Sequence, residues 1–142
     1  MKIKIILVLV SISIILLFIP YNLAVVRGNS MSPTLHDFQI VVLTSSTECL
    51  QLNDLVIFNR EGYSDNNFIK RITAVEGDTI YYNTEPYPSY SHTSISPTSQ
   101  EIIIPKGYYF LEGDNKDESI DSRNSAVGLV NISEITGKVV MY

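Results

Sequence analysis

The sequence predicts a mainly β fold: a folded antiparallel β-sheet or partial barrel behind one N-terminal transmembrane helix. The chain of 142 residues opens with an apolar run. The residues after it form short segments rich in β-branched and aromatic side chains between turn signals, and none of them keeps a sustained helical period. We therefore expect an anchor over residues 1–26 and a β-rich domain over residues 27–142.

The anchor is predicted from residues 5–19, in which serine is the only polar residue type. A spanning helix needs about 17 to 25 residues, so the helix must also take in Pro20 and the apolar residues 23–26, although proline would kink or end it. A cleavable secretion signal has a similar basic start and apolar centre, but no Ala-x-Ala cleavage site follows this run. A retained anchor is therefore the favoured interpretation.

Basic residues orient this anchor. Lys2 and Lys4 precede the apolar run, and a single Arg27 follows it. The positive-inside rule then places the N-terminus in the cytoplasm and the domain outside. We expect a monomeric, single-pass type II protein of the plasma membrane, whose extracytoplasmic domain stands at the lipid bilayer.

Seven segments of the domain have the composition of strands. They are residues 38–43, 54–58, 69–75, 79–82, 101–104, 108–111 and 137–141. Turn signals such as residues 76–78 separate them. Residues 131–135 have room for one helical turn. Residues 83–100, rich in Ser, Thr, Pro and Tyr, predict an exposed loop.

Charge and cysteine content exclude several classes of protein. The whole chain has 10 Lys and Arg against 15 Asp and Glu, a net charge of −5. Without Lys2 and Lys4, the rest of the chain is more acidic still. Nucleic-acid backbones are bound by basic surfaces, so we expect no nucleic-acid partner. Cys49 is the only cysteine, so no intrachain disulfide and no cysteine zinc cluster can form. We expect neither a metal nor a cofactor.

Ser30 is the first candidate for chemistry. Gly28 and Asn29, which tolerate positive φ, precede it, and Pro33 stiffens the chain after it. This composition suits a tight turn that exposes a hydroxyl and a backbone N–H, as an oxyanion site needs. It also suits an ordinary turn. A serine hydroxyl becomes a strong nucleophile only when a base takes its proton.

Lys70 is the candidate base. By strand alternation its side chain shares a face with the apolar Phe68 and Ile72, while Arg71 points outward. Burial would lower the pKa of the lysine, and a neutral amine could accept the proton of Ser30 near neutral pH. A surface lysine that buries only its methylene stem fits the strand as well.

Residues 113–123 form a third candidate element, dense in turn formers and acidic side chains. They suit either a solvated acidic loop or a scaffold for the serine and the lysine. In the second case Ser119 or Ser122 would hydrogen-bond to the lysine amine. An ion pair between Asp121 and Arg123 would then brace the loop.

Other catalytic patterns fit less well. No His-Glu-x-x-His and no Ser-x-x-Lys motif occurs, and Ser30 lies in Gly-x-Ser-x-Ser instead of Gly-x-Ser-x-Gly. A Ser-His-Asp triad would need His36, six residues from Ser30, or His92 in the polar loop. A Ser-Lys pair is the arrangement that the sequence favours.

The chain resembles bacterial type I signal peptidases of peptidase family S26, the membrane-anchored Ser-Lys endopeptidases that remove signal peptides from exported preproteins. Four motifs in order carry the resemblance: Ser-Met-Ser-Pro-Thr-Leu at 30–35, Asn-Asp-Leu-Val-Ile-Phe at 53–58, Ile-Lys-Arg at 69–71 with Gly-Asp at 77–78, and residues 113–123. The resemblance implies that Ser30 attacks, that Lys70 is the base and that Ser119 bonds the lysine amine. It also implies supporting roles for Asp121, Ser122 and Arg123.

The resemblance further implies how a preprotein signal peptide binds. Small pockets accept small side chains at the cut and two residues before it, and we expect Met31, Phe68 and Ile69 to contact the substrate. Two features depart from the family. Gly28 stands where some members have a serine that helps to bind the oxyanion, so the oxyanion hole would consist of backbone N–H groups. Residues 124–127 also lengthen a connection that is usually two residues long.

Two other functions stay open at this point. One is a catalytically inactive, membrane-tethered module that binds preproteins, which the presence of all the expected catalytic residues disfavours. The other is a self-cleaving repressor-type Ser-Lys protease, which the anchor and the acidic charge disfavour.

Overall fold

The computed structural model describes residues 4–6, 10, 21–60, 62, 67–83, 89–91 and 99–142. The described domain is mainly β, and its paired strands are antiparallel, which confirms the predicted fold class for this part of the chain. The predicted membrane segment, residues 5–19, lies largely outside the described residues. Within what is described, no helix has both the length and the apolar character needed to cross a bilayer.

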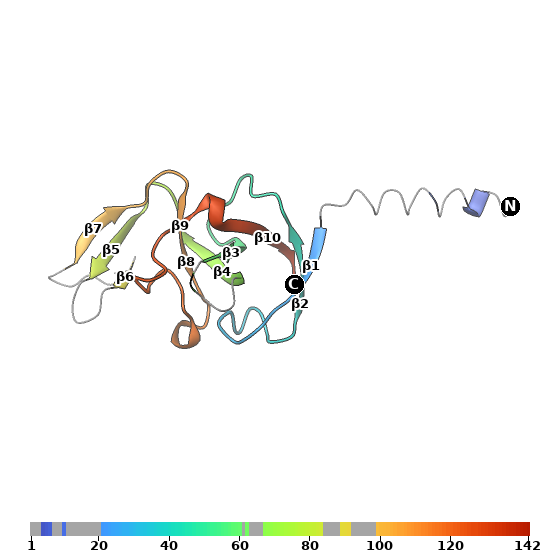
Figure 1. Cartoon of the computed structure of the whole chain (residues 1–142), viewed down its shortest axis with the longest axis horizontal. Helices are drawn as coiled ribbons and strands as arrows, with labels where there is room; N and C mark the ends of the chain where they lie inside the picture. The colour runs from blue at the N-terminus through green and yellow to red at the C-terminus, as the bar shows by residue number, and fades with distance from the viewer. Residues whose placement is uncertain are drawn as a thin grey trace.

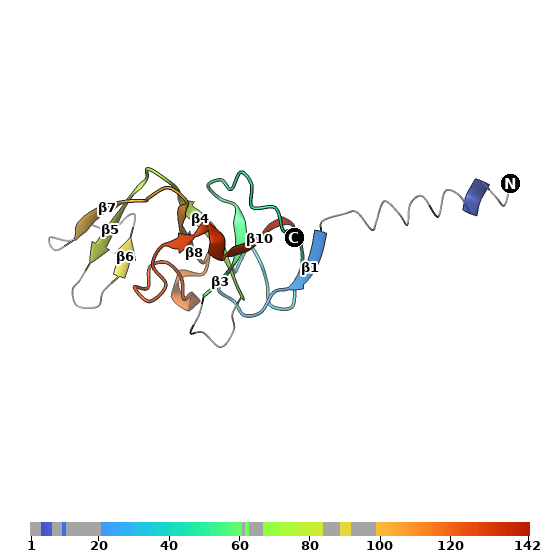
Figure 2. The same cartoon turned by 45° about the horizontal axis from the view of Figure 1, so that its top comes forward.

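The described strands form two sheets (Figures 1 and 2). The larger has seven strands in the order β1-β2-β10-β3-β4-β8-β9, and the smaller has the order β6-β5-β7. The larger sheet consists of β1 (Tyr21–Val25), β2 (Ile40–Thr44), β3 (Leu55–Asn59), β4 (Asn67–Ala74), β8 (Tyr108–Glu112), β9 (Val130–Asn131) and β10 (Ile135–Met141). The smaller consists of β5 (Thr79–Asn83), β6 (Ser89–Ser91) and β7 (Gln100–Ile103). Both views place the smaller sheet at the end of the domain away from β1.

Irregular pairing curls the larger sheet. The register of β4 against β8 shifts between Ile72 and Ala74, and that of β10 shifts against both of its neighbours. Bulges of this kind bend a strand and increase its twist. The sheet thus folds into a partial barrel, in which β10 lies between β2 and β3.

The curl buries both faces of β3, whose four residues from Leu55 to Phe58 are all buried. Val56 and Phe58 belong to one hydrophobic core. Leu55 belongs to a second core with Met31 and Leu35. This second core lies beneath the turn that carries Ser30, so the packing of the sheet determines where that turn sits.

The seven predicted strands are confirmed, with ends that differ by no more than two residues. The helical turn expected at residues 131–135 is the 3-10 helix η2 (Ile132–Glu134), capped by the Asn131 side chain, which accepts from the Ser133 N–H. Phe38 was expected in a strand but precedes β2, where its φ of 62° marks a turn.

Three strands were not predicted. β1 lies in residues that the sequence analysis assigned to the anchor, and it pairs with β2 from Tyr21 opposite Thr44 to Val25 opposite Ile40. An apolar segment that continues a membrane run lacks the polar alternation that would have marked a strand. β9 has only two residues, and β6 falls within the expected loop 83–100, of which residues 84–88 and 92–98 lie outside the described residues.

Candidate active site

Ser30 lies in the turn that links β1 to β2. Gly28 opens this turn with a φ of +80°, and its N–H donates to the Asp37 carboxylate at 2.9 Å. Met31 and Leu35 follow Ser30 and are 2% and 0% exposed, because they pack into the core below. These contacts hold the turn on the sheet and leave the Ser30 hydroxyl at the wall of a groove.

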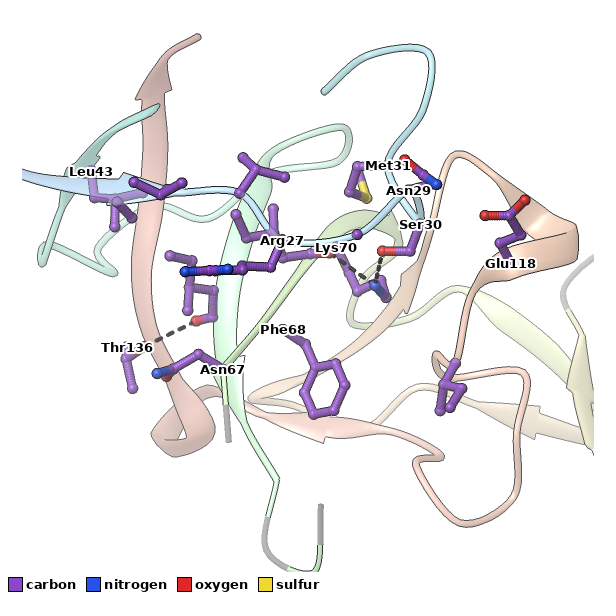
Figure 3. A pocket seen from close by; sticks show the side chains of 17 residues that line it. Arg27, Asn29, Ser30, Met31, Leu43, Asn67, Phe68, Lys70, Glu118 and Thr136 are labelled. Carbon is purple, nitrogen blue, oxygen red and sulfur yellow. Dashed lines mark hydrogen bonds between the residues drawn. The ribbon is translucent and has the colours of Figure 1, made fainter. Parts of the chain in front are cut away.

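Lys70, on β4, meets Ser30 within this groove. Its Nζ donates to Ser30 Oγ at 2.7 Å and to the Ile69 carbonyl at 3.1 Å. Figure 3 shows the two side chains pointing toward one another. Lys70 is 3% exposed, and its Nζ lies 5.9 Å from the centroid of the Phe68 ring. The structure thus brings together the two residues that the sequence analysis paired.

Burial lowers the pKa of Lys70 from 10.5 to about 8. Nearby charges act in both directions, because Asp121 and Asp114 raise this pKa and Arg123 lowers it. A group with a pKa near 8 is neutral in roughly a tenth of the molecules at pH 7. The amine beside Ser30 can therefore act as a base near neutral pH, which an ordinary surface lysine cannot do.

The loop after β8 surrounds a buried carboxylate. Asp121, 1% exposed, accepts from Arg123 Nε at 2.9 Å and from Arg123 Nη2 at 2.8 Å. The Gly113 N–H also donates to it at 2.8 Å. Burial opposes ionisation of Asp121, but the hydrogen bonds from Arg123 and Gly113 and the interaction with Ser119 outweigh that effect and hold its pKa below the usual value. The loop is thus closed around an ion pair and is not a solvated acidic segment.

The two serines of this loop do not form the expected hydrogen bond with Lys70. Ser122 is fully buried and clips the loop to β8, since its Oγ accepts from the Leu111 N–H at 3.0 Å. The Ser119 hydroxyl is also buried and forms no hydrogen bond of standard geometry with the described residues, although its interaction with the Asp121 carboxylate helps to lower the pKa of that group. The expected hydrogen bond from Ser119 or Ser122 to the Lys70 amine is therefore not seen among the described residues. Lys70 donates to the Ile69 carbonyl instead.

Gly113 explains how closely this loop approaches Ser30. A Cβ added to Gly113 would overlap the Ser119 hydroxyl and would lie 2.6 Å from the Ser30 carbonyl oxygen. Real Cβ atoms do not approach that closely. Only glycine therefore lets the loop pack between Ser119 and the turn that carries Ser30.

Two groups that sequence reasoning did not assign to the site hold its parts together. Arg71, expected to point outward, forms a two-pronged ion pair with Asp114 at 2.8 and 2.6 Å and also donates to the Asn53 carbonyl at 3.0 Å. Asn115 bonds the turn that carries Ser30. The signal that the sequence offered for these two residues was that Arg71 is next to Lys70 and that Asn115 is next to Asp114.

The segment after Arg123 packs onto the domain. Val127 is buried in the main core, and its carbonyl accepts from Arg60 Nη2 at 2.6 Å. The Val127 and Gly128 N–H groups both donate to the Asn124 carbonyl. The longer connection at residues 124–127 is thus a compact turn.

The groove beside Ser30 and Lys70 has a volume of about 730 Å³. Residues 24–28 line one wall and residues 67–70 line the other. Met31, Phe68 and Ile69, the three residues expected to contact substrate, all line it, and Figure 3 shows Met31 and Phe68 beside the Ser30–Lys70 pair. Among the described residues, no cluster of His, Cys, Asp or Glu is arranged to hold a metal ion.

The sheet leaves room for a further strand in this groove. Among the described strands, β1 is the first of the sheet and pairs on one side only, with β2. β8 pairs with β4 from Arg71 onward and not along the segment that precedes Lys70. An extended peptide between these two walls could therefore form main-chain hydrogen bonds and place one carbonyl at Ser30.

Comparison with known proteins gives one consistent family. The family model described as "Signal peptidase, peptidase S26" matches residues 1–87 and 83–142. The chain is 34% identical to signal peptidase I T of Bacillus subtilis (strain 168), over 85% of this chain and 71% of that protein. It is 30% identical to signal peptidase IB of Staphylococcus aureus (strain Mu50), over 92% of this chain and 83% of that protein. A crystal structure of a signal peptidase I from Enterococcus faecalis V583 covers 66% of this chain and 98% of its own, at 21% identity and a TM-score of 0.46.

Proposed function

The chain belongs to the signal peptidase family, peptidase S26, and is a serine endopeptidase that removes signal peptides from preproteins; we propose that Ser30 is its nucleophile and Lys70 its general base. The observation that carries this proposal is the 2.7 Å contact between Lys70 Nζ and Ser30 Oγ. The burial that lowers the pKa of Lys70 to about 8 supports it. Nucleophile and base within hydrogen-bond reach are the signature of an activated serine.

The proposed reaction needs only these two side chains and water. Neutral Lys70 takes the proton of Ser30 as Oγ attacks the scissile carbonyl carbon. The Lys70 ammonium then gives that proton to the departing amine, and the acyl group remains on Oγ. Lys70 next takes a proton from water, whose oxygen attacks the acyl carbon, and returns it to Ser30 as the signal peptide leaves.

Backbone groups would stabilise the negative oxygen that forms in this reaction. Gly28 has no side chain to donate, which leaves the turn itself as the source of donors. The Ser30 N–H makes no hydrogen bond within the described part of the chain. An unbonded N–H on the residue that attacks is well placed to donate to an oxyanion.

The substrate would bind as a strand in the groove, with Met31, Phe68 and Ile69 among the residues that contact its side chains. The apolar residues of the lining, with the unpaired strand edges beside them, favour the short extended segment around the cleavage site. Contacts of this kind position the scissile carbonyl at Ser30, which supplies much of the rate enhancement in any peptidase.

The loop after β8 would support the lysine. We propose that Asp121, Arg123 and Ser122 hold this loop in place through the contacts described above. The buried Ser119 hydroxyl, which packs against Gly113 next to Ser30, would take over the Lys70 amine once Ser30 has become acylated and no longer bonds it. The Asp121 carboxylate, with which the Ser119 hydroxyl interacts, would hold this hydroxyl in place.

We further propose that the apolar run ahead of β1, within residues 1–20, anchors the enzyme in the plasma membrane, with the N-terminus in the cytoplasm and the domain outside. The basic residues before this run support that orientation. The first described strand exposes Leu23 and Val25, and β2 exposes Ile40 opposite Val25. Such apolar exposure fits a strand that begins at the lipid surface, where the apolar segment of a preprotein would also end.

Cleavage of a preprotein by three matched variants tests the dyad. Ser30→Ala and Lys70→Ala should each lower kcat/KM by at least about a thousandfold, because each removes one half of the activated nucleophile. Ser32→Ala, in the same turn, is the control and should cleave at nearly the rate of the unmodified enzyme. Cleavage that persists in Ser30→Ala or Lys70→Ala would refute the assignment.

A further inference from the structure

Asn115 makes two contacts with the turn that carries Ser30. Its backbone N–H donates to the Ser30 carbonyl at 3.0 Å. Its side-chain Nδ2 donates to the Asn29 carbonyl at 3.2 Å, across 86 residues of sequence. The Asn29 carbonyl accepts a second hydrogen bond, from the Ser32 N–H at 3.0 Å. Two donors thus hold the carbonyl of the residue before the nucleophile.

The Asn29 carbonyl and the Ser30 N–H belong to the same peptide group. In a planar trans peptide, the C=O and the N–H point in opposite directions. Fixing the Asn29 oxygen toward Asn115 and Ser32 therefore also fixes the direction of the Ser30 N–H. Hydrogen bonds accepted by the carbonyl polarise the peptide group and make its N–H a better donor.

We propose that Asn115 is a positioning residue for the oxyanion site: through the Asn29 carbonyl, its side-chain amide orients and polarises the Ser30 N–H. This inference rests on the proposed role of Ser30 as the nucleophile. Asn115 itself touches neither the substrate nor the reacting atoms. Figure 3 shows Asn29 and Ser30 adjacent at the groove.

The loop that carries Asn115 does not depend on its side chain for its own structure. Gly113 is held by the Asp121 carboxylate, and Asp114 is held by Arg71. The 3-10 helix η1 (Lys116–Glu118) that follows Asn115 receives no side-chain cap from it. The side-chain amide of Asn115 therefore bonds the turn that carries Ser30 instead of its own loop. Substitutions of Asn115 that keep the backbone conformation should fold.

Two substitutions separate hydrogen bonding from packing. Asn115→Asp keeps the size and shape of the side chain but replaces the donor with an oxygen that repels the Asn29 carbonyl. Asn115→Ala removes the donor without adding repulsion. A positioning role predicts that activity falls from wild type to Ala to Asp. A packing role predicts the reverse order of the two variants, because Asp fills the same space as Asn.

The measurements are kcat and KM for a preprotein and the affinity for a peptide boronate, all with the full chain. The boronate forms a tetrahedral adduct on Ser30 that places an oxygen in the oxyanion site. Loss of a direct oxyanion donor costs about 10²–10³ in kcat. For an indirect effect we expect about a tenfold loss in Ala and a larger loss in Asp. Boronate affinity should fall in parallel, with KM nearly unchanged.

Two controls complete the test. Asn22→Asp removes another side-chain amide donor, whose bond to Ser45 Oγ at 3.3 Å involves no residue that lines the groove, and it should leave both readouts unchanged. In Asn115→Ala, the dependence of kcat/KM on pH should keep the same midpoint, because Asn115 does not titrate.

Three outcomes would overturn the proposal. They are an Asp variant as active as Ala or more active, a loss confined to KM, or boronate affinity that stays constant while kcat falls. Ser30→Ala, assayed alongside, tells which claim has failed. If it is inactive while Asn115→Asp behaves as wild type, the dyad stands and the role of Asn115 is refuted. If Ser30→Ala still cleaves, the proposed nucleophile has failed, and the role of Asn115 fails with it.

Discussion

At the scale of single residues, the burial that suits Lys70 to act as a base also destabilises its charged form. Its amine is buried, and burial lowers its pKa from 10.5 to about 8. The charged form is therefore less stable in the folded protein than in the unfolded chain. The same burial that makes the lysine a usable base thus makes the folded state less stable at neutral pH.

This cost predicts the stability of Lys70→Met. Between pH 8 and 10.5 the unfolded chain binds more protons at this residue than the folded protein, so the stability of the wild type rises with pH in that window. The methionine side chain does not titrate, and its apolar character suits a buried site. Below pH 8 the variant should gain up to about 3 kcal/mol in free energy of unfolding, and the gain should shrink as the pH rises toward 10.5.

Denaturant titrations from pH 6 to pH 11 would measure this difference. Lys106→Met replaces an exposed lysine and should show no such dependence on pH. A difference between Lys70→Met and wild type that stays constant across the window would contradict the burial argument.

The same residue scale shows where sequence reasoning ended. Strand alternation correctly placed the Lys70 side chain on the buried face with Ile72. It could not predict that Lys70 would donate to the Ile69 carbonyl instead of Ser119. Partners of that kind depend on how closely two segments pack, and here the packing is set by the missing side chain of Gly113.

At the scale of elements, the loop after β8 packs closely against the turn that carries Ser30, and Gly113 is the point of contact. Gly113→Ala should push Ser30 and Ser119 away from their positions, because the added Cβ would lie 2.6 Å from the Ser30 carbonyl oxygen. We expect a loss of about 1–3 kcal/mol in stability and of about a hundredfold or more in kcat/KM, since misplacement of about 1 Å can cost that much.

Gly137→Ala is the matched control for this prediction. Its Cβ would meet only the Thr44 carbonyl, at 3.1 Å, on strands that do not carry Ser30 or Lys70. It should lower the melting temperature modestly and leave kcat/KM almost unchanged. Equal losses of activity in the two variants would show that Gly113 has no special relation to the site.

Strands could be predicted where a composition rich in β-branched and aromatic residues was bounded by turn signals. The strand that carries Lys70 was recognised because it is rich in β-branched residues and lies between two turn signals. β1 was not, because its residues continue the apolar character of the preceding run. Its role in the sheet depends on pairing with β2, which is a tertiary contact that composition does not reveal.

At the scale of the whole molecule, the order of the strands assembles the site. The turn after β1, the middle of β4 and the loop after β8 meet at one groove, although 40 residues separate Ser30 from Lys70. The motifs indicated which segments carry chemistry. The meeting of these segments required the curl of the sheet and the insertion of β10 between β2 and β3, neither of which follows from local sequence.

The central claim is that Ser30 attacks the substrate with Lys70 as its base. Mass spectrometry of the full chain after reaction with a peptide boronate or an acylating substrate analogue tests this most directly. We predict one adduct on the peptide that contains Ser30, formed at a rate that rises with pH around the Lys70 pKa of about 8 and almost lost in Lys70→Ala. An adduct on another residue, or one that forms equally fast without Lys70, would contradict the account.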